Sequence, residues 1–167
     1  MRVLIFCVSA LLCFPTLLCF PTASAQISNP KIGADNYING QELVPLTGDA
    51  LTAVFSGKTH YGTYKELRER TGTNKFHENT KADGSTYYVE GDMKLHGQWR
   101  VFNNRICYQY DSTEVSGVHC FVIYEAGTCL YGYDPSVTGP KGPINANYWT
   151  VKSIRKGDVS TCDDLIG

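Results

Sequence analysis

The hydrophobic pattern divides the chain into an apolar run, a polar stretch and a long periodic region. Residues 3–20 are apolar apart from Ser9 and Thr16. Residues 26–46 are polar, with scattered Asn, Gly and Pro and little periodicity, which is typical of a flexible leader. The pattern becomes periodic from there on, so we expect a single β domain over residues 47–167.

One short stretch of the periodic region has helical spacing. Leu51, Val54 and Phe55 recur at i, i+3 and i+4 and would therefore share one face of a helix. Gly57 suits the left-handed conformation that commonly follows a helix end. These features predict a helix over residues 48–56.

The remainder of the periodic region predicts about eight strands joined by short turns. Asp83-Gly84 separates two such stretches, and Asn103-Asn104 is a two-residue loop that can adopt positive φ. The strands are expected over residues 59–64, 75–80, 85–90, 97–102, 105–110, 118–124, 128–133 and 147–154.

The predicted fold class is therefore all-β with one short N-terminal helix. Consecutive strands with short links favour an antiparallel up-and-down meander, curled into a small barrel or half-barrel that is lipocalin-like or avidin-like in outline. Alternation places Gly97, Trp99 and Val101 on the interior face. The charged residues 65–74 and the Pro/Gly-rich residues 134–146 do not fit strands, and we expect both as surface connections.

Residues 1–25 have the form of a secretory signal peptide. Arg2 supplies a positive n-region, and Ala23-Ser24-Ala25 is a small-residue cleavage site. Because the apolar run is long, an uncleaved membrane anchor and a lipidated N-terminus are alternatives. All three outcomes export the body of the chain. We expect a periplasmic or extracellular protein with no stable membrane insertion after signal cleavage.

An exported location favours disulfide bonds between the cysteines. Three of the seven belong to the signal peptide, and the mature chain keeps Cys107, Cys120, Cys129 and Cys162. An even number in an oxidising compartment indicates disulfides, and the absence of C-x-x-C makes a zinc or redox site the weaker alternative. Cys107 and Cys120 lie in consecutive strands, within disulfide range if they pair across a hairpin. This leaves Cys129 for Cys162, although four cysteines allow three pairings.

Composition and motifs exclude several function classes. Lys and Arg number 15 against 16 Asp and Glu, a balance that favours neither nucleic acid nor an anionic membrane surface as partner. His60, His77, His96 and His119 fall one per strand or strand end, without the close spacing of a metal site. The sequence has no G-x-S-x-G motif. We predict no catalytic residue, metal or cofactor, and favour a non-enzymatic protein.

Aromatic residues are the remaining sign of function. The chain has eleven tyrosines, most of them in predicted strands. A tyrosine combines an apolar ring with a hydroxyl that needs a partner, which suits a cavity lining or an interface as well as an ordinary β core. We expect an aromatic concave face around Trp99, with Tyr61, Tyr88 and Tyr108 as further binding residues.

Several short motifs resemble those of small exported proteobacterial proteins that form an uncharacterised domain family. They are L-T-A-V-F-S-G-K-T-H-Y-G over residues 51–62, Asp83-Gly84, G-Q-W-R-V over residues 97–101, and the paired Cys107 and Cys120. The family pattern is F-x-G-K-T, D-G, G-x-W and paired cysteines. The resemblance implies export and a small β fold, and it implies no activity.

A second resemblance is to periplasmic lysozyme inhibitors, which are small disulfide-bonded β-barrels with an S-G-x-x-Y loop. Here Tyr61 follows Ser56-Gly57 one residue later than that loop requires.

Three functions remain open from the sequence. The first is a non-enzymatic barrel that binds an unidentified small molecule or envelope component. The second is a protein-binding module, such as a periplasmic inhibitor of a cell-wall-degrading enzyme, that acts through the loops at the barrel mouth. The third is an envelope hydrolase, which requires titratable side chains that converge in one pocket.

Overall fold

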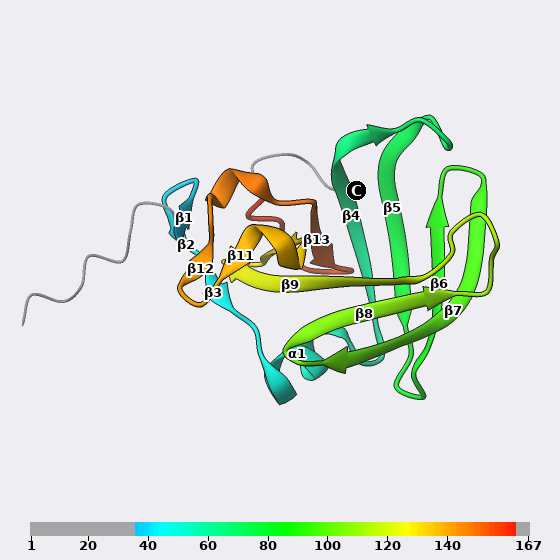
Figure 1. Ribbon diagram of the computed structural model, residues 1–167, viewed down its shortest axis with the longest axis horizontal. Coiled ribbons are helices and arrows are strands. Elements are labelled where there is room, and N and C mark those ends of the chain that lie inside the picture. Colours follow the sequence, from blue (N-terminus) through cyan, green and yellow to red (C-terminus); the bar gives the residue numbers. More distant parts are fainter. Residues whose placement is uncertain (1–35, 163–167) are drawn as a thin grey trace, which may run out of the picture. The chain divides into compact units, whose positions relative to one another are not determined.

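The computed structural model describes residues 36–162, which form an antiparallel β-barrel (Figure 1). The predicted signal peptide and the first part of the predicted leader lie outside the described residues. The barrel strands are β4 (Lys58–Arg68), β5 (Thr73–Thr80), β6 (Ser85–Glu90), β7 (Met93–Phe102), β8 (Arg105–Tyr110), β9 (Val118–Ala126), β10 (Cys129–Tyr133) and β13 (Val151–Arg155).

The barrel is fully closed. Strands β4 to β9 pair in chain order, β10 pairs with both β9 and β13, and β13 pairs with β4. Every pairing is antiparallel, and closure leaves the eight strands without a free edge around the ring. The predicted all-β barrel with one short helix is confirmed.

The turn residues behave as their chemistry requires. Asn103 and Asn104 join β7 to β8 with φ values of 49° and 56°, the conformation of a tight two-residue hairpin loop. Between β5 and β6, Gly84 has a φ of 87°, and the Asp83 carboxylate accepts a hydrogen bond from the Ser85 N–H at 2.9 Å. Both predicted hairpins are therefore present.

Alternation along β7 places one set of side chains inside the barrel. Leu95, Gly97 and Trp99 are buried, whereas the residues between them are exposed. Gly97 is needed because a Cβ at this position would lie only 2.3 Å from the carbonyl oxygen of Gln109 on β8. The predicted interior face of this strand is confirmed.

Helix α1 (Gly48–Phe55) closes one end of the barrel and matches the helix expected over residues 48–56. Its apolar face buries Leu51 and Phe55. Together with interior side chains of the strands they form an apolar cluster: Leu46, Leu51, Phe55, Trp99, Ile106, Tyr108, Ile123 and Leu130. The barrel therefore has an apolar floor at the α1 end.

The described part of the expected flexible leader is structured instead. β1 (Tyr37–Ile38) and β2 (Gln41–Glu42) form a small hairpin, and β3 (Val44–Pro45) pairs with the second half of β9. Ile38 and Leu43 are buried. These two apolar residues hold the segment against the barrel by hydrophobic contact, although the segment is polar in composition.

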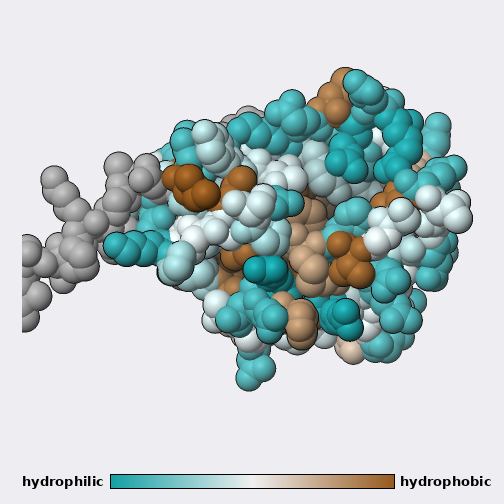
Figure 2. Space-filling model, in the orientation of Figure 1, coloured by the Kyte–Doolittle hydropathy of each residue, from teal (hydrophilic) through white to brown (hydrophobic). Residues whose placement is uncertain are grey.

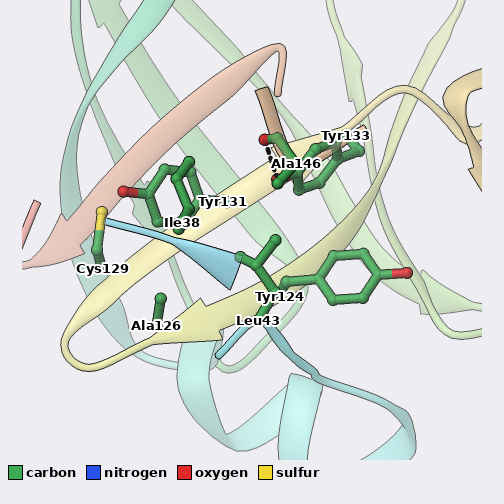
Figure 3. Close-up of a cluster of buried hydrophobic side chains, with 8 residues drawn as sticks. All are labelled: Ile38, Leu43, Tyr124, Ala126, Cys129, Tyr131, Tyr133 and Ala146. Atoms are coloured by element: carbon green, nitrogen blue, oxygen red, sulfur yellow. Dashed lines mark hydrogen bonds between the residues drawn. The ribbon is translucent and has the colours of Figure 1, made fainter. Parts of the chain in front are cut away.

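Ile38 and Leu43 belong to a second apolar cluster on the outer side of the barrel wall (Figure 3). Its members are Ile38, Leu43, Tyr124, Ala126, Cys129, Tyr131, Tyr133 and Ala146. Strand β10 is buried along its whole length. The side chains of α1 and of the barrel interior cover its inner side, and the second cluster covers its outer side.

The Pro/Gly-rich connection between β10 and β13 completes this cover. It contains the 3₁₀ turns η2 (Pro135–Val137) and η3 (Ala146–Tyr148), and a short pair of strands, β11 (Thr138–Gly139) and β12 (Gly142–Pro143). The Tyr133 hydroxyl donates a hydrogen bond to the Ala146 carbonyl at 2.7 Å, the dashed line in Figure 3. The charged residues 65–74 are mostly strand, since β4 continues to Arg68 and β5 begins at Thr73.

Tyr133→Phe should weaken this connection. The substitution leaves the buried Ala146 carbonyl without its donor, which costs about 1–2 kcal/mol. Urea unfolding would measure the loss, with Tyr148→Phe as the matched control because Tyr148 is exposed on η3. Equal stabilities of the two variants would show that this hydrogen bond contributes nothing.

Two disulfides form with the predicted pairing. Cys107 on β8 bonds to Cys120 on β9, with Cα atoms 4.0 Å apart, and the two residues are direct partners in the strand register. Cys129 bonds to Cys162 across a Cα separation of 5.1 Å, so the chain after β13 is tied to the start of β10. Disulfides of this kind indicate an oxidising compartment. Within residues 36–162, no helix has the length and apolar character needed to cross a bilayer.

Candidate ligand-binding cavity

The barrel contains a cavity of about 420 Å³, a size within the range of small-molecule sites. Its floor is the apolar cluster at the α1 end, with Phe55, Ile106 and Leu130 among the lining residues. Its mouth lies at the other end, where Arg70 follows β4 and Asp134 follows β10. The cavity therefore lies along the interior of the barrel, between α1 and the far loops.

Aromatic rings line one wall of this cavity in a continuous row. The successive ring centroids of Tyr64, Phe76, Tyr88 and Tyr110 are 5.1, 5.7 and 5.3 Å apart. Tyr108 continues the row at 6.2 Å from Tyr110. These rings come from β4, β5, β6 and β8, so the row runs around the barrel from Tyr64 to Tyr110 and then along β8 to Tyr108.

Two glycines make room for the row. Tyr88 and Tyr110 contact each other across β7, which lies between their strands and presents Gly97 to the interior at that point. On β4, a Cβ at Gly62 would lie 2.3 Å from the Phe76 ring. The absence of side chains at these two interior positions lets the large rings approach one another.

Two carboxylates are buried among the rings. Glu78 on β5 is 5% exposed and Glu90 on β6 is 1% exposed. The Thr86 hydroxyl donates to Glu78 at 2.7 Å, and the Tyr110 hydroxyl lies 3.0 Å from both Glu78 oxygens. Glu90 accepts hydrogen bonds from the hydroxyls of Tyr88 and Thr71. Hydroxyl donors therefore hold both carboxylates in the cavity wall.

The two carboxylates differ in their charged neighbours. Arg68 lies near the mouth with its Nε 3.8 Å from Glu90 and its guanidinium 4.5 Å from the centroid of the Tyr64 ring. Glu78 lies deeper, and its described partners are the uncharged hydroxyls of Thr86 and Tyr110. Burial raises the pKa of Glu78 to about 7, although the two hydroxyl hydrogen bonds act in the opposite direction.

The tyrosines of the wall remain protonated at neutral pH. Burial raises the pKa of Tyr64 to about 12, and burial also raises the pKa values of Tyr88, Tyr108 and Tyr110. The nearby Glu78 carboxylate adds to this rise for Tyr108 and Tyr110. Two of these hydroxyls therefore act as hydrogen-bond donors to the carboxylates, Tyr88 to Glu90 and Tyr110 to Glu78.

His60 is the unusual member of the lining. It lies on β4 directly opposite Glu78 in the strand register, is 2% exposed, and packs on Phe55 with ring centroids 4.5 Å apart. Within the described chain, neither ring nitrogen has a hydrogen-bond partner. Burial and then the positive charge of Arg155 lower the His60 pKa to about 4, so the ring is neutral at pH 7. It presents one donor and one acceptor nitrogen without partners.

The structure separates the four residues predicted for binding. Tyr88 and Tyr108 line the cavity. Trp99 lies below it in the apolar floor, where its indole N–H donates to the Lys81 carbonyl at 2.7 Å. Tyr61 lies on the outer side of β4, beside His77 in an open hollow of the barrel surface.

His60, Glu78 and Glu90 are cavity residues that the sequence does not predict as binding residues. One signal was present, because Glu90 is two residues from Tyr88 and therefore shares its face of the strand. The pairing of His60 with Glu78 depends on the register of β4 against β5, which no motif in the sequence specifies. Between residues 36 and 162, no three His, Cys, Asp or Glu side chains group closely enough to hold a metal ion.

Comparisons of the chain with models of known protein families, with curated proteins and with solved structures found no match. The resemblance to small exported proteobacterial proteins therefore stays a prediction.

Proposed function

We propose that this protein is an exported binding protein that holds a small organic molecule inside its barrel and does not transform it. The observation that supports this proposal most strongly is the cavity itself, whose wall carries two buried carboxylates and an imidazole with no hydrogen-bond partner among residues 36–162. The two disulfides and the predicted signal peptide support a periplasmic or extracellular location.

The energetic cost of burying polar side chains in the cavity wall is the reason to assign the cavity a function. A small barrel is stabilised most simply when apolar side chains fill its interior. This barrel has an apolar cluster at its α1 end, but it also buries Glu78, Glu90 and His60 along the cavity wall. Burial of a carboxylate and of an unpaired imidazole is destabilising. A bound molecule that supplies the missing partners would offset this cost.

Features of the chain favour binding over catalysis. All four described cysteines are in disulfides and therefore provide no thiolate nucleophile. Hydroxyl donors already engage both carboxylates, which suits fixed acceptors. The face in Figure 2 is mostly hydrophilic, with its hydrophobic side chains in separate patches.

A thermal-shift screen with small molecules tests the proposal. A ligand at 100 times its Kd stabilises the folded state by about 2.7 kcal/mol, which raises the Tm by several degrees. We expect compounds that stabilise the wild type to have no effect on Ser153→Phe. Ser153 faces the cavity from β13, so a phenyl ring there occupies the ligand volume.

The control for the screen is Lys94→Phe. Lys94 is exposed on β7 and pairs with Val89 away from the cavity, so this variant adds the same ring outside the barrel and should respond as the wild type does. An equal response of Ser153→Phe and wild type would place the binding site outside the cavity and contradict the proposal.

A further inference from the structure

We propose that the molecule bound in the cavity carries a protonated amine, held between Glu78 and His60, with a compact apolar body that extends along the barrel. This inference rests on the proposed function and names the chemical class of its ligand. Four features of the cavity support it: the charge at Glu78, the free nitrogens of His60, the aromatic wall and the apolar side opposite.

The charge balance of the cavity is incomplete at Glu78. Glu90 has a guanidinium partner in Arg68, whereas the described partners of Glu78 are hydroxyl groups. A deeply buried carboxylate is stabilised by a cation far more than by neutral donors. A ligand ammonium group that enters from the mouth would give Glu78 the positively charged partner that the described residues do not supply.

His60 adds an acceptor beside this carboxylate. The two residues are direct cross-strand partners on the interior face, where Cβ atoms are typically about 4.5–5.5 Å apart. A neutral imidazole has one nitrogen that accepts a hydrogen bond, and an ammonium group has three donors. One ammonium can therefore donate to Glu78 and to His60 at once. A carboxylate ligand would face Glu78 as a like charge.

The barrel already holds one cation, the Arg68 guanidinium, beside a carboxylate and an aromatic ring, which is the arrangement proposed for the ligand amine. At the mouth, the Arg68 guanidinium lies over the Tyr64 ring and beside Glu90. Deeper in the cavity, Glu78 accepts a hydrogen bond from the hydroxyl of Tyr110, a member of the same aromatic row. Aromatic faces attract cations, with a larger effect where water is excluded. The deeper position also combines a carboxylate with an aromatic residue, and the residues that the structure describes place no cation beside it.

The opposite side of the cavity is apolar in its deeper part, and β9 also contributes His119 nearer the mouth. Phe121 and Ile123 on β9 and Leu130 on β10 line it, and β9 lies across the ring of strands from β5, which carries Glu78. Figure 1 shows β5 and β9 on different sides of the barrel. An amine on a purely polar molecule would leave these side chains without contacts, so the proposed ligand has an apolar or aromatic body.

Three probes of equal size and different charge test the inference by isothermal titration calorimetry at pH 7.5: 2-phenylethylamine, 2-phenylethanol and phenylacetate. We expect the amine to bind the wild type at least tenfold more tightly than the alcohol, and the carboxylate to bind most weakly. Equal or tighter binding of the alcohol or the carboxylate overturns the inference. If none of the three binds, the amine assignment is also overturned.

The thermal-shift screen distinguishes failure of the inference from failure of the proposed function. A compound of another class that stabilises the wild type but not Ser153→Phe would leave the binding function standing while the amine assignment falls. If no compound in the screen behaves in this way, both fail.

Two variants locate the amine. Glu78→Gln keeps the shape and removes the charge, so we expect amine affinity to fall at least tenfold while alcohol affinity stays within twofold. Glu66→Gln is the control, because Glu66 is exposed on the same strand as His60. His60→Leu removes the unpartnered nitrogens, and we expect weaker amine binding with an unchanged or higher Tm. Amine binding by both variants as tight as in the wild type would contradict the assignment.

Discussion

Gly97→Ala should destabilise the barrel by about 3 kcal/mol, a large effect for the addition of one methyl group. The new Cβ would lie 2.3 Å from the Gln109 carbonyl oxygen and 2.8 Å from the Tyr110 Cα. Both atoms belong to the backbone of β8, which hydrogen-bonds to β7, so they cannot move away as the end of a flexible side chain would.

Urea unfolding of Gly97→Ala measures this effect, and Gly139→Ala is the matched control. A Cβ at Gly139 would meet only the Gly142 carbonyl, at 3.9 Å, so the control should unfold as the wild type does. The shift of β8 should also separate the Tyr88 and Tyr110 rings and so disturb the cavity. If the two variants have the same free energy of unfolding, the close packing of β7 on β8 is not what requires glycine.

The second large effect is a pair of opposite pH dependences at Glu78 and His60. The Glu78 pKa is raised from 4.5 to about 7 by burial. The folded state therefore binds the extra proton between these values. The contribution of Glu78 to stability is fully present below pH 4.5 and is lost as the pH rises to about 7, a loss of about 3 kcal/mol.

His60 acts with the opposite sign. Its pKa is lowered from 6.5 to about 4, so the unfolded state binds the extra proton. The contribution of His60 is present above pH 6.5 and is lost as the pH falls to about 4, again by about 3 kcal/mol. Between about pH 4.5 and 6.5 the two contributions oppose each other, so in the wild type they largely cancel.

Single variants should remove this cancellation. Relative to wild type, Glu78→Gln should lose stability as the pH falls from 6.5 to 4.5, and His60→Leu should lose stability as the pH rises from 4.5 to 7. The other titratable groups near this pair are unchanged in both variants: Lys58, Tyr64, Tyr88, Glu90, Tyr108, Tyr110, Arg155 and Asp158. Urea unfolding across this pH range gives both differences. If the stability curves of both variants run parallel to the wild-type curve, the pKa values of Glu78 and His60 are not shifted by burial.

The sequence predicts the barrel well because its strands carry strong local signals. The alternation around Trp99, the positive-φ turn at Asn103-Asn104 and the cross-strand Cys107 and Cys120 each constrain the structure through neighbouring residues. The N-terminal segment is predicted poorly because Ile38 and Leu43 are single apolar residues in a polar stretch. Their partners are outward-facing residues of β9 and β10, which alternation alone assigns to solvent.

The candidate site is harder to predict because it depends on register and on the position of the helix. The sequence correctly places Trp99 inside the barrel. However, α1 packs at that end of the barrel, and Trp99 becomes part of the apolar floor of the cavity. Tyr61 and His60 are adjacent and face opposite sides of β4, and only the pairing with β5 decides which of them enters the cavity.

Intermolecular nuclear Overhauser contacts between 2-phenylethylamine and the wild-type protein would show where the amine lies in the barrel. We expect contacts from the methylene next to the amine to His60 and to the methylenes of Glu78, and from the phenyl ring to Phe121 and Ile123. Contacts confined to the outer face, at Tyr61, His77 and Tyr87, would contradict this placement.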